Sequence, residues 1–597
     1  VVAAHVADFG AWHYDVQRNV AAVTPLLVDF LYAAGYMAGG EVAARLVNVG
    51  TLLVTLAGVH AAVRSVASRR VALLATLLAA ASPLVALESA SLFIDNGWAL
   101  FVVASLVALL RFAKGGEPVH FVAGGIAFGA ALASKAITVA ALPAAALLVG
   151  LAWHDRRRAF PWRTLAGAVV AGLAVALPPY VIAFAKTGNP VFPLFNAVFR
   201  SPLFPPRSAI LYPAEADPAL LYRMTFYSDR YLEAYPGALG FTLLLLLPAM
   251  IAAAARWGRR DGRAMLFAAI AFAAFVVANT AYLRYVYPSL FLFAIAVGTT
   301  LPALDRSDAL LGGAFKLTAL GGVVVSALFL PAAFAPLRTF DLRAIHDAGA
   351  RDAFVTAWAP TRQFVPLLNA MPAERGAVAF LGAQPYLAQI TRPAYTDVAY
   401  QRGFLDAGAA LRTEADLLRL IRDFELGFLV VDARRLPRLP ALVHGATLPL
   451  ARAGDVTLFE VTPHARYQVE HLPDDGFDAS PGGWVPTGEP ARSGAAVVVN
   501  GASALYRPVA VQAGAAYRYA VDARCHDVPA ELRLQVLWQL PGGGTKVDAR
   551  AVPCTPHWSE ASDVLVAPPG TSMAVVYATG HAAAPVEIRR VSFRSKR

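Results

Sequence analysis

Long apolar stretches recur through the first 335 residues of this 597-residue chain. A helix needs roughly 20 apolar residues to cross a bilayer core about 30 Å thick. Ten stretches approach that length, near residues 42–63, 71–88, 92–111, 119–134, 137–153, 164–186, 238–255, 264–281, 285–302 and 313–334. Only 15% of the residues are charged, whereas soluble proteins carry about 25%. We therefore expect a polytopic α-helical membrane domain of about ten helices over residues 41–335.

Positive charge in the short connections alternates along the chain. Every second connection is rich in arginine or lysine, at Arg64, Arg69, Arg70, Arg111, Lys114, Arg156, Arg157, Arg158, Arg163, Arg256, Arg259, Arg260, Arg263 and Arg306. The connections between them hold little positive charge beyond Lys135 and Arg284. Because short loops rich in Lys and Arg stay in the cytoplasm, residues 1–40, 187–237 and all those after 335 are predicted to lie outside it. The same clustering accounts for the net charge of +11, so no nucleic acid is expected as a partner.

Ten spans place both predicted ends of the chain outside. No leader precedes this outer start, which predicts one more helix upstream, absent from this sequence. Residues 1–40 are then an exterior loop and interfacial helix. The outer connection 187–237 is long, and loops above about 15 residues are usually functional or disordered. Its many prolines and aromatic residues favour short interfacial helices beside a substrate entrance.

Polar residues return after the last apolar stretch. AVAFLG (377–382), ADLLRLIRDF (415–424) and LGFLVVDA (426–433) have the patterns of strand, helix and strand. A small α/β domain is predicted over residues 336–464. Residues 465–597 contain short alternating strands separated by Pro and Gly turns, which predict a β-sandwich. Both tail domains are expected outside the cytoplasmic membrane.

Two cysteines, Cys525 and Cys554, both fall in the predicted sandwich. An exterior compartment permits a disulfide between them, and two buried free thiols are the alternative. Trp484, Trp538 and Trp558 lie in the same region. They suit either stacking on sugar rings or core packing, the commoner fate of such side chains.

Ionisable and aromatic side chains gather at the predicted outer ends of the membrane helices. They are Glu88, Asp95, Lys135, Arg284, Tyr285 and Tyr287. Ionisable groups at membrane depth are costly and usually mark function or a buried pair. Contact with lipid headgroups is the alternative.

Five segments, in order along the chain, carry a family resemblance: PLLVDFLYAAGYMAGGEVAARLVN (25–48), SLFIDNGWALF (91–101), GIAFGAALASKAIT (125–138), TGNPVFPLFN (187–196) and LRYVYPSLFLFAIA (283–296). They include an acidic residue at the mouth of a helix, a glycine-rich helix ending in Ser-Lys, and an Arg-Tyr-x-x-Pro helix. Together they resemble the C-type (GT-C) membrane glycosyltransferases, chiefly bacterial relatives of the protein mannosyltransferases and aminoarabinose transferases. The resemblance covers roughly residues 8–335, with a family-like α/β tail to about residue 462.

The resemblance implies that a polyprenyl-phosphate sugar is the donor. It implies transfer with inversion at the outer face of a bacterial cytoplasmic membrane, to a lipid, glycan or protein acceptor. It also implies that an aspartate in the first exterior loop acts as base or orients the acceptor. DFGAWHYD (8–15) has the Asp-x4-His spacing of that motif, which gives the role to Asp8 with His13 beside it. In the other register the motif lies upstream of residue 1.

This chemistry needs a carboxylate to take the acceptor's proton and cations to stabilise the departing phosphate. Asp95 is the further catalytic candidate. The predicted substrate-binding residues are Glu88, Lys135, Asn189, Arg284, Tyr285 and Tyr287. We predict that Asp8, Asp95, Lys135 and Arg284 converge on one exterior cavity. The sequence contains no clear metal-ligand set and implies no certain cofactor, and it leaves a divalent metal open.

Two other classes of function fit the composition. A multi-pass transporter suits ten or eleven spans, but transporters tend to contain internal repeats and broken helices, and no repeat is visible. The second alternative is a non-catalytic cell-envelope assembly protein derived from the enzyme fold. The glycosyltransferase is preferred because the charged residues lie at the outer helix ends, where a surface reaction needs them.

Overall fold

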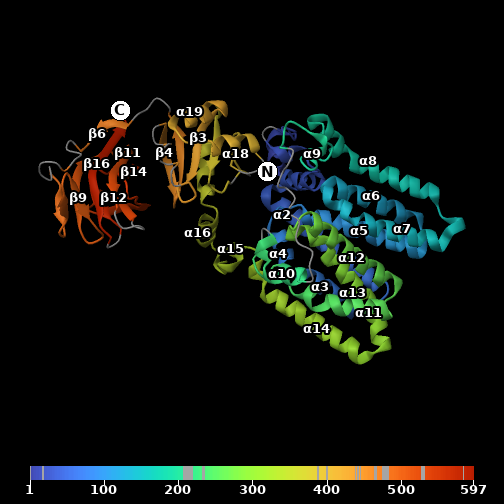
Figure 1. Cartoon of the computed structure of the whole chain (residues 1–597). Coiled ribbons are helices and arrows are strands. Elements are labelled where there is room, and N and C mark those ends of the chain that lie inside the picture. Colours follow the sequence, from blue (N-terminus) through green and yellow to red (C-terminus); the bar gives the residue numbers. More distant parts are fainter. Residues whose placement is uncertain are drawn as a thin grey trace. The chain divides into compact units, whose positions relative to one another are not determined.

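The chain forms a helical domain followed by two sheet-containing domains (Figure 1). The computed structural model describes residues 2–16, 19–205, 219–231, 235–385, 387, 389–397, 401–436, 439, 443, 446–462, 467–472, 477, 483–525, 531–581 and 584–596. The chain divides into two compact units, with the boundary between Phe354 and Val355. The first unit holds the helical bundle, and the second holds the sheets.

Seven helical segments among the described residues are long and apolar enough to cross a membrane. They are α2 (Leu27–Arg64), α5 (Asp95–Gly115), Ala136–Arg156 with α7 (Leu142–Arg156), α8 (Trp162–Thr187), α12 (Arg260–Asn279), Leu283–Ser307 with α13 (Tyr287–Ser307), and α14 (Ala309–Leu328). A bent pair, α3 (Arg69–Ala80) and α4 (Pro83–Ala90), forms an eighth candidate, and α6 (Pro118–Ser134) and α11 (Thr242–Trp257) are shorter apolar helices. Each of the ten predicted spans falls on one of these segments. The polytopic helical bundle is therefore confirmed.

Helix α2 begins well before the first predicted span, because it continues across a break at Gly39 and Gly40. Gly40 has a φ of 67°, a backbone conformation that glycine adopts at little cost. The break separates the turns that follow Leu27 from those that end at Arg64. The part before the break is a helical segment of its own that packs on the bundle, and the part after the break corresponds to the predicted span 42–63.

The bend between α3 and α4 has local causes. The two helices meet at 66°. Ser82 caps α4 by accepting a hydrogen bond from the Leu84 amide, and Pro83 occupies the first turn, a position that proline favours. The Ser82 hydroxyl also donates to the carbonyl of Leu239 at 2.8 Å. These contacts fix α4 against the segment that precedes α11.

Helix α13 occupies the centre of the bundle and is buried along most of its length. Its neighbours include α12, α3, α14 and α2. At the side of the bundle, α6 and α8 cross closely (Figure 1). Gly125 and Gly129 of α6 face Ala168 and Gly172 of α8, where backbone meets backbone. This is the spacing of small residues that brings membrane helices together.

Short elements cover the end of the bundle where α5 begins. They are α1 (Val2–Phe9), η1 (Val20–Val23), α9 (Asn196–Phe199), α10 (Leu220–Phe226) and η4 (Ser228–Tyr231). The last three lie in the long connection 187–237 and are short helices, as the sequence predicts, although residues 206–218 and 232–234 of it lie outside the described residues. After α14 come η6 (Leu330–Ala332), α15 (Ala335–Arg338), η7 (Leu342–Ile345) and α16 (Ala348–Trp358).

The first sheet has the strand order β2-β1-β3-β5-β4. Its strands are β1 (Ala377–Leu381), β2 (Ala394–Thr396), β3 (Leu426–Asp432), β4 (Thr447–Ala453) and β5 (Val456–Val461). β1 runs parallel to β2 and β3, and β5 is antiparallel to its neighbours. Helices η8 (Pro360–Phe364), α17 (Val365–Ala370), α18 (Arg402–Ala409) and α19 (Glu414–Asp423) complete the domain. Every residue of β1 and β3 is buried, which confirms the α/β pattern.

The second and third sheets form the sandwich. One has the order β13-β12-β15-β10-β7, the other β14-β11-β16-β9-β8, with β6 beside β16. The bounds are β6 (Tyr467–Glu470), β7 (Val485–Thr487), β8 (Ala491–Ser493), β9 (Ala496–Val499), β10 (Ala504–Ala510), β11 (Ala516–Arg524), β12 (Glu531–Gln539), β13 (Thr545–Pro553), β14 (Ser559–Val566), β15 (Met573–Gly580) and β16 (Val586–Lys596). The predicted alternation holds, because Tyr517, Tyr519 and Val521 of β11 are buried. The sandwich is confirmed.

The tryptophans and cysteines of the sandwich take definite places. Trp484 and Trp538 are buried in its core, so for these two the core-packing alternative is correct. Trp558 lies between the guanidinium groups of Arg524 and Arg589, at 4.8 and 4.7 Å. The sulfurs of Cys525 and Cys554 are bonded, with their Cα atoms 5.8 Å apart.

Candidate functional site

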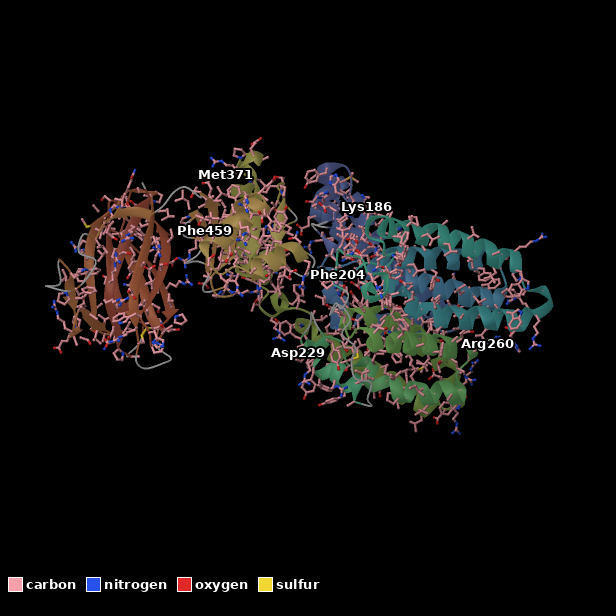
Figure 2. The ribbon with its side chains drawn as sticks, turned by 45° about the horizontal axis from the view of Figure 1, so that its top comes forward. Lys186, Phe204, Asp229, Arg260, Met371 and Phe459 are labelled. Atoms are coloured by element: carbon pink, nitrogen blue, oxygen red, sulfur yellow. A yellow bond between two sulfur atoms is a disulfide. The ribbon has the colours of Figure 1, made fainter. Side chains whose placement is uncertain are left out.

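The two ends of the helical bundle differ in chemistry. Figure 2 shows Arg260 at one end, and Lys186 and Phe204 at the other. At the first end, Arg260 pairs with Asp155, and the Lys114 ammonium lies 2.8 Å from Asp261. These pairs join the ends of α5 and α7 to the start of α12. The positively charged connections predicted to be cytoplasmic meet there, and the candidate site lies at the opposite end.

Three chain segments meet at Asp95, the first residue of α5. Its carboxylate has no exposed surface. Oδ1 lies 2.5 Å from the ammonium of Lys135, and Oδ2 lies 3.8 Å from Nη1 of Arg284. Lys135 ends α6 and Arg284 belongs to η5 (Leu283–Val286), directly before α13. The structure thus joins three predicted site residues that are far apart in sequence.

Local structure places each of these side chains. Asp95 opens α5, where the helix dipole favours a carboxylate. Lys135 is extended, with a φ of −160°, so α6 stops there and the chain turns into η2 (Ala136–Ala141). The Thr138 hydroxyl, which accepts a hydrogen bond from the Trp98 indole at 2.7 Å, anchors this turn to α5.

Aromatic rings surround both cations. The Lys135 ammonium lies 3.7 Å from the ring centre of Tyr285 and 4.6 Å from that of Trp98. The Arg284 guanidinium lies 4.3 Å from the ring centre of Phe93. Rings stabilise a partly desolvated cation over their faces. The exposed fractions of the Lys135 and Arg284 side chains are 13% and 15%, so both side chains are mostly, but not completely, buried.

A buried chain of polar groups supports α5 behind Asp95. The Tyr287 hydroxyl donates to Oδ1 of Asn96 at 2.6 Å, and the Asn96 amide donates to Oδ1 of Asn48 at 3.0 Å. The Tyr32 hydroxyl donates to the same Asn48 oxygen at 2.8 Å, and the Asn48 amide reaches the carbonyl of Glu88. This network ties α2, α4, α5 and α13 together. Tyr287 was predicted to bind substrate, but in the structure its hydroxyl donates its hydrogen bond to Asn96 in this network.

Sequence reasoning missed Tyr32, Asn48 and Asn96. The available signal was that Asn48 and Asn96 are amides inside or beside apolar stretches, where an unsatisfied polar group is expensive. Glu88 is also fully buried. It lies close enough to Lys135, Tyr32 and Tyr287 for its charge to act on them.

Asp29 is a further carboxylate that sequence reasoning missed. It lies in the first turn of α2, within electrostatic range of Asp95. Its neighbour Val28 is buried and packs against Gly97 in the first turn of α5. Tyr32, one turn later, donates to the Phe93 carbonyl at 3.0 Å. The available signal was an aspartate in the otherwise apolar run PLLVDFLY.

Asp8 and His13 do not join this cluster. Asp8 is exposed at the end of α1, and among the residues that the structure describes no hydrogen bond or ion pair links it to Asp95. His13 bonds to the ring of His5 at 2.9 Å. Burial and the neighbouring His13 lower the pKa of His5. The catalytic role of Asp8 and His13 stays a prediction.

Asn189 supports its own loop. Its amide donates to the Leu194 carbonyl at 2.8 Å, and its side-chain oxygen accepts from the Val191 amide at 3.0 Å. These bonds hold the turn that follows α8, as in other asparagine-centred turns. The predicted contact of Asn189 with substrate is not supported by any of these bonds.

An apolar pocket of about 270 Å³ lies between α10, α11, α12 and α13. Its lining includes Leu221, Met224, Leu243, Ala273, Val277 and Phe293. Val286 and Ser289 also line it, and Val286 is two residues from Arg284. The pocket and the charged cluster therefore share the short segment between α12 and α13.

The arrangement suits an amphiphilic anion. Partly exposed cations at the cluster can receive a phosphate, and the pocket can take an apolar chain. Within the described ranges no group of three or more His, Cys, Asp or Glu side chains is placed to hold a metal ion.

The helical part of the chain is similar to known proteins in sequence and in fold. Residues 23–182 match the family described as dolichyl-phosphate-mannose-protein mannosyltransferase. Two crystal structures of ArnT from Cupriavidus metallidurans, in the apo state and bound to undecaprenyl phosphate, match with TM-scores of 0.51 and 0.50. Each is 16% identical in sequence, and each match covers 77% of this chain and 92% of the other. A comparison with curated protein sequences gave no match. The chain thus shares the fold of these two ArnT structures, and its residues 23–182 are similar to the mannosyltransferase family model.

Proposed function

We propose that this chain is a membrane glycosyltransferase that moves a sugar from a polyprenyl-phosphate donor to an acceptor at the outer face of the cytoplasmic membrane. The observation that carries the proposal is the convergence of Lys135 and Arg284 on Asp95 beside an apolar pocket. A donor of this class has an anionic phosphate between a sugar and a long apolar chain. The cluster and the pocket match those two parts.

Each residue of the cluster then has its own role in the transfer reaction. As the bond between the anomeric carbon and the phosphate oxygen breaks, negative charge grows on the lipid phosphate. Lys135 and Arg284 stabilise that charge in a partly desolvated site, where such contacts are strongest. Asp95 holds both cations in place, and Glu88 adds buried negative charge near Lys135. Tyr285 lies under the Lys135 ammonium and orients it.

The lipid chain of the donor occupies the apolar pocket. Leu221 and Met224 come from the outer connection, and Ala273 and Phe293 come from the membrane helices. This gives the predicted substrate entrance a physical role, since the same segment would admit the lipid. Undecaprenyl phosphate is the lipid bound in one of the similar ArnT structures, and it is the natural probe.

The test is binding and transfer with the full chain in lipid vesicles. The wild type is offered a panel of undecaprenyl-phosphate hexoses and pentoses together with lipid, glycan and protein acceptors, and consumption of donor is measured. Ala273→Trp fills the pocket and should raise the Kd for undecaprenyl phosphate at least tenfold. Ala174→Trp is the matched control, because Ala174 is exposed on α8. Equal binding by the two variants, or no consumption of any donor, contradicts the proposal.

A further inference from the structure

The candidate site has four carboxylates in or beside it, and they have different surroundings. Asp95 is fully buried and paired with two cations. Glu88 is fully buried in α4. Asp8 is exposed and lies beside α2 near Tyr36, one turn beyond Tyr32. Asp29 differs from the other three because it lies within electrostatic range of Asp95 and its residue is only partly buried.

We infer that Asp29 is the catalytic base that takes the proton from the acceptor. The inference rests on the proposed function and names a residue within it. Its geometry comes from the packing of the first turn of α2 on the first turn of α5, where Val28 contacts Gly97. Asp29 and Tyr32 are three residues apart on one helix and therefore share a face. Tyr32 is bonded to the Phe93 carbonyl, two residues before Asp95, so this face of α2 is turned toward the cluster.

The charges around the two aspartates assign different tasks to them. Asp95 is held by Lys135 and Arg284, so its carboxylate oxygens already face two cations of the protein. Among the residues that the structure describes, no lysine or arginine pairs with Asp29. Its charge and that of Asp95 act on each other, and both act on Tyr32. Asp95 is therefore assigned to holding the two cations, and Asp29 is left to contact the acceptor.

The acceptor hydroxyl oxygen forms a bond to the anomeric carbon while the bond from that carbon to the phosphate oxygen breaks. The bonding electron pair leaves with the lipid phosphate, which Lys135 and Arg284 receive. The hydroxyl proton passes to the carboxylate of Asp29. For an acceptor amine the same carboxylate takes one proton from nitrogen.

A purely structural role for Asp29 would give a different result for turnover. A carboxylate in the first turn of a helix also stabilises the helix through its dipole, by about 0.3–1 kcal/mol. If that were the whole role of Asp29, Asp29→Asn would lower stability slightly and leave turnover unchanged. The test must therefore separate turnover from folding and from donor binding.

The experiment uses the full chain in vesicles, the donor that the wild type consumes, and undecaprenyl phosphate as the binding probe. Asp29→Asn should lower kcat at least 100-fold, while the donor KM and the Kd for undecaprenyl phosphate change less than twofold. Asp29→Glu should recover part of the activity. Glu117→Gln is the control, because it removes an exposed carboxylate from the start of α6, at the other end of that helix from Lys135.

Azide gives a sharper readout, because this nucleophile has no proton to lose. With Asp29→Ala and azide as acceptor, formation of the glycosyl azide should approach the wild-type rate. The inference is overturned if Asp29→Asn keeps kcat within twofold of the wild type, or if it loses undecaprenyl phosphate binding together with activity. A wild type that binds the lipid but consumes no donor overturns the proposed function instead, and the inference falls with it.

Discussion

The ammonium of Lys135 lies 2.5 Å from Oδ1 of an Asp95 side chain that has no exposed surface. Removing one member of a buried ion pair leaves the other as an uncompensated charge, which costs about 3–5 kcal/mol. The pair therefore has consequences for stability as well as for chemistry.

We predict that Asp95→Asn abolishes transfer and also lowers stability, although the side chain keeps its shape. Lys135 and Arg284 lose their common partner, and Lys135 is largely buried. In Asp95→Asn/Lys135→Met the buried ammonium is gone, so the double variant should be more stable than Asp95→Asn alone. Thermal unfolding in detergent of the wild type, Asp95→Asn, Lys135→Met and the double variant measures this double-mutant cycle. Strictly additive losses would show that the two residues are not coupled.

Arg284 is expected to matter more for the donor phosphate than for folding. Its guanidinium is 3.8 Å from Asp95, a looser contact than that of Lys135, and 15% of its side chain is exposed. Arg284→Ala should raise the Kd for undecaprenyl phosphate at least tenfold, and Arg284→Lys should recover only part of this, because ammonium lacks the two-pronged geometry of guanidinium. Lys186→Ala removes an exposed cation from the outer end of α8 and is the control. Equal effects of the two alanine variants would assign the binding to general surface charge.

Much of this site was predictable because ionisable residues at helix ends are easy to see against an apolar background. Asp95, Lys135 and Arg284 each follow or precede a long apolar stretch, and alternating loop charge placed them at one end of the bundle. Asp29 was missed for the opposite reason. The first span was predicted to start at residue 42, so Asp29 was assigned to the exterior loop and interfacial helix of residues 1–40. In the structure the helical segment that begins at Leu27, before the break at Gly39 and Gly40, packs against the start of α5.

The polar network was harder to predict, because hydrogen-bond partners depend on packing that periodicity does not specify. Asn96 and Tyr287 are 191 residues apart and meet only because α13 passes α5. The predicted role of Asn189 in binding substrate stays a prediction. A Gly-Asn-Pro segment suits a turn as well as a binding loop, and the Asn189 amide holds the turn.

The crossing of α6 and α8 gives a prediction about stability. A Cβ atom at Gly129 would lie 2.1 Å from the carbonyl oxygen of Gly172, and backbone cannot move aside as a side chain does. Gly129→Ala should therefore separate the helices and cost about 3 kcal/mol. Gly313→Ala is the control, because a Cβ at Gly313 meets nothing within 4 Å and alanine favours a helix. Equal melting temperatures for both variants would contradict close packing at Gly129.

The disulfide allows a test of where the tail lies. The Cys525–Cys554 bond closes a loop with a sequence separation of 29, and a loop of that size stabilises a fold by about 3 kcal/mol. Disulfides persist in exterior compartments and are rare in the cytosol. If the tail lies outside, cysteines of protein taken directly from cells should resist a mass-adding maleimide until a reductant is added. Cys525→Ser/Cys554→Ser controls for labelling and should lower the unfolding temperature of the sandwich.

The position of the tail can also be tested with a reporter fusion. An exported phosphatase fused after residue 340 should be active. Thiols that react at once, together with an inactive phosphatase, would place the tail in the cytoplasm and reverse the orientation inferred from the arginine-rich loops.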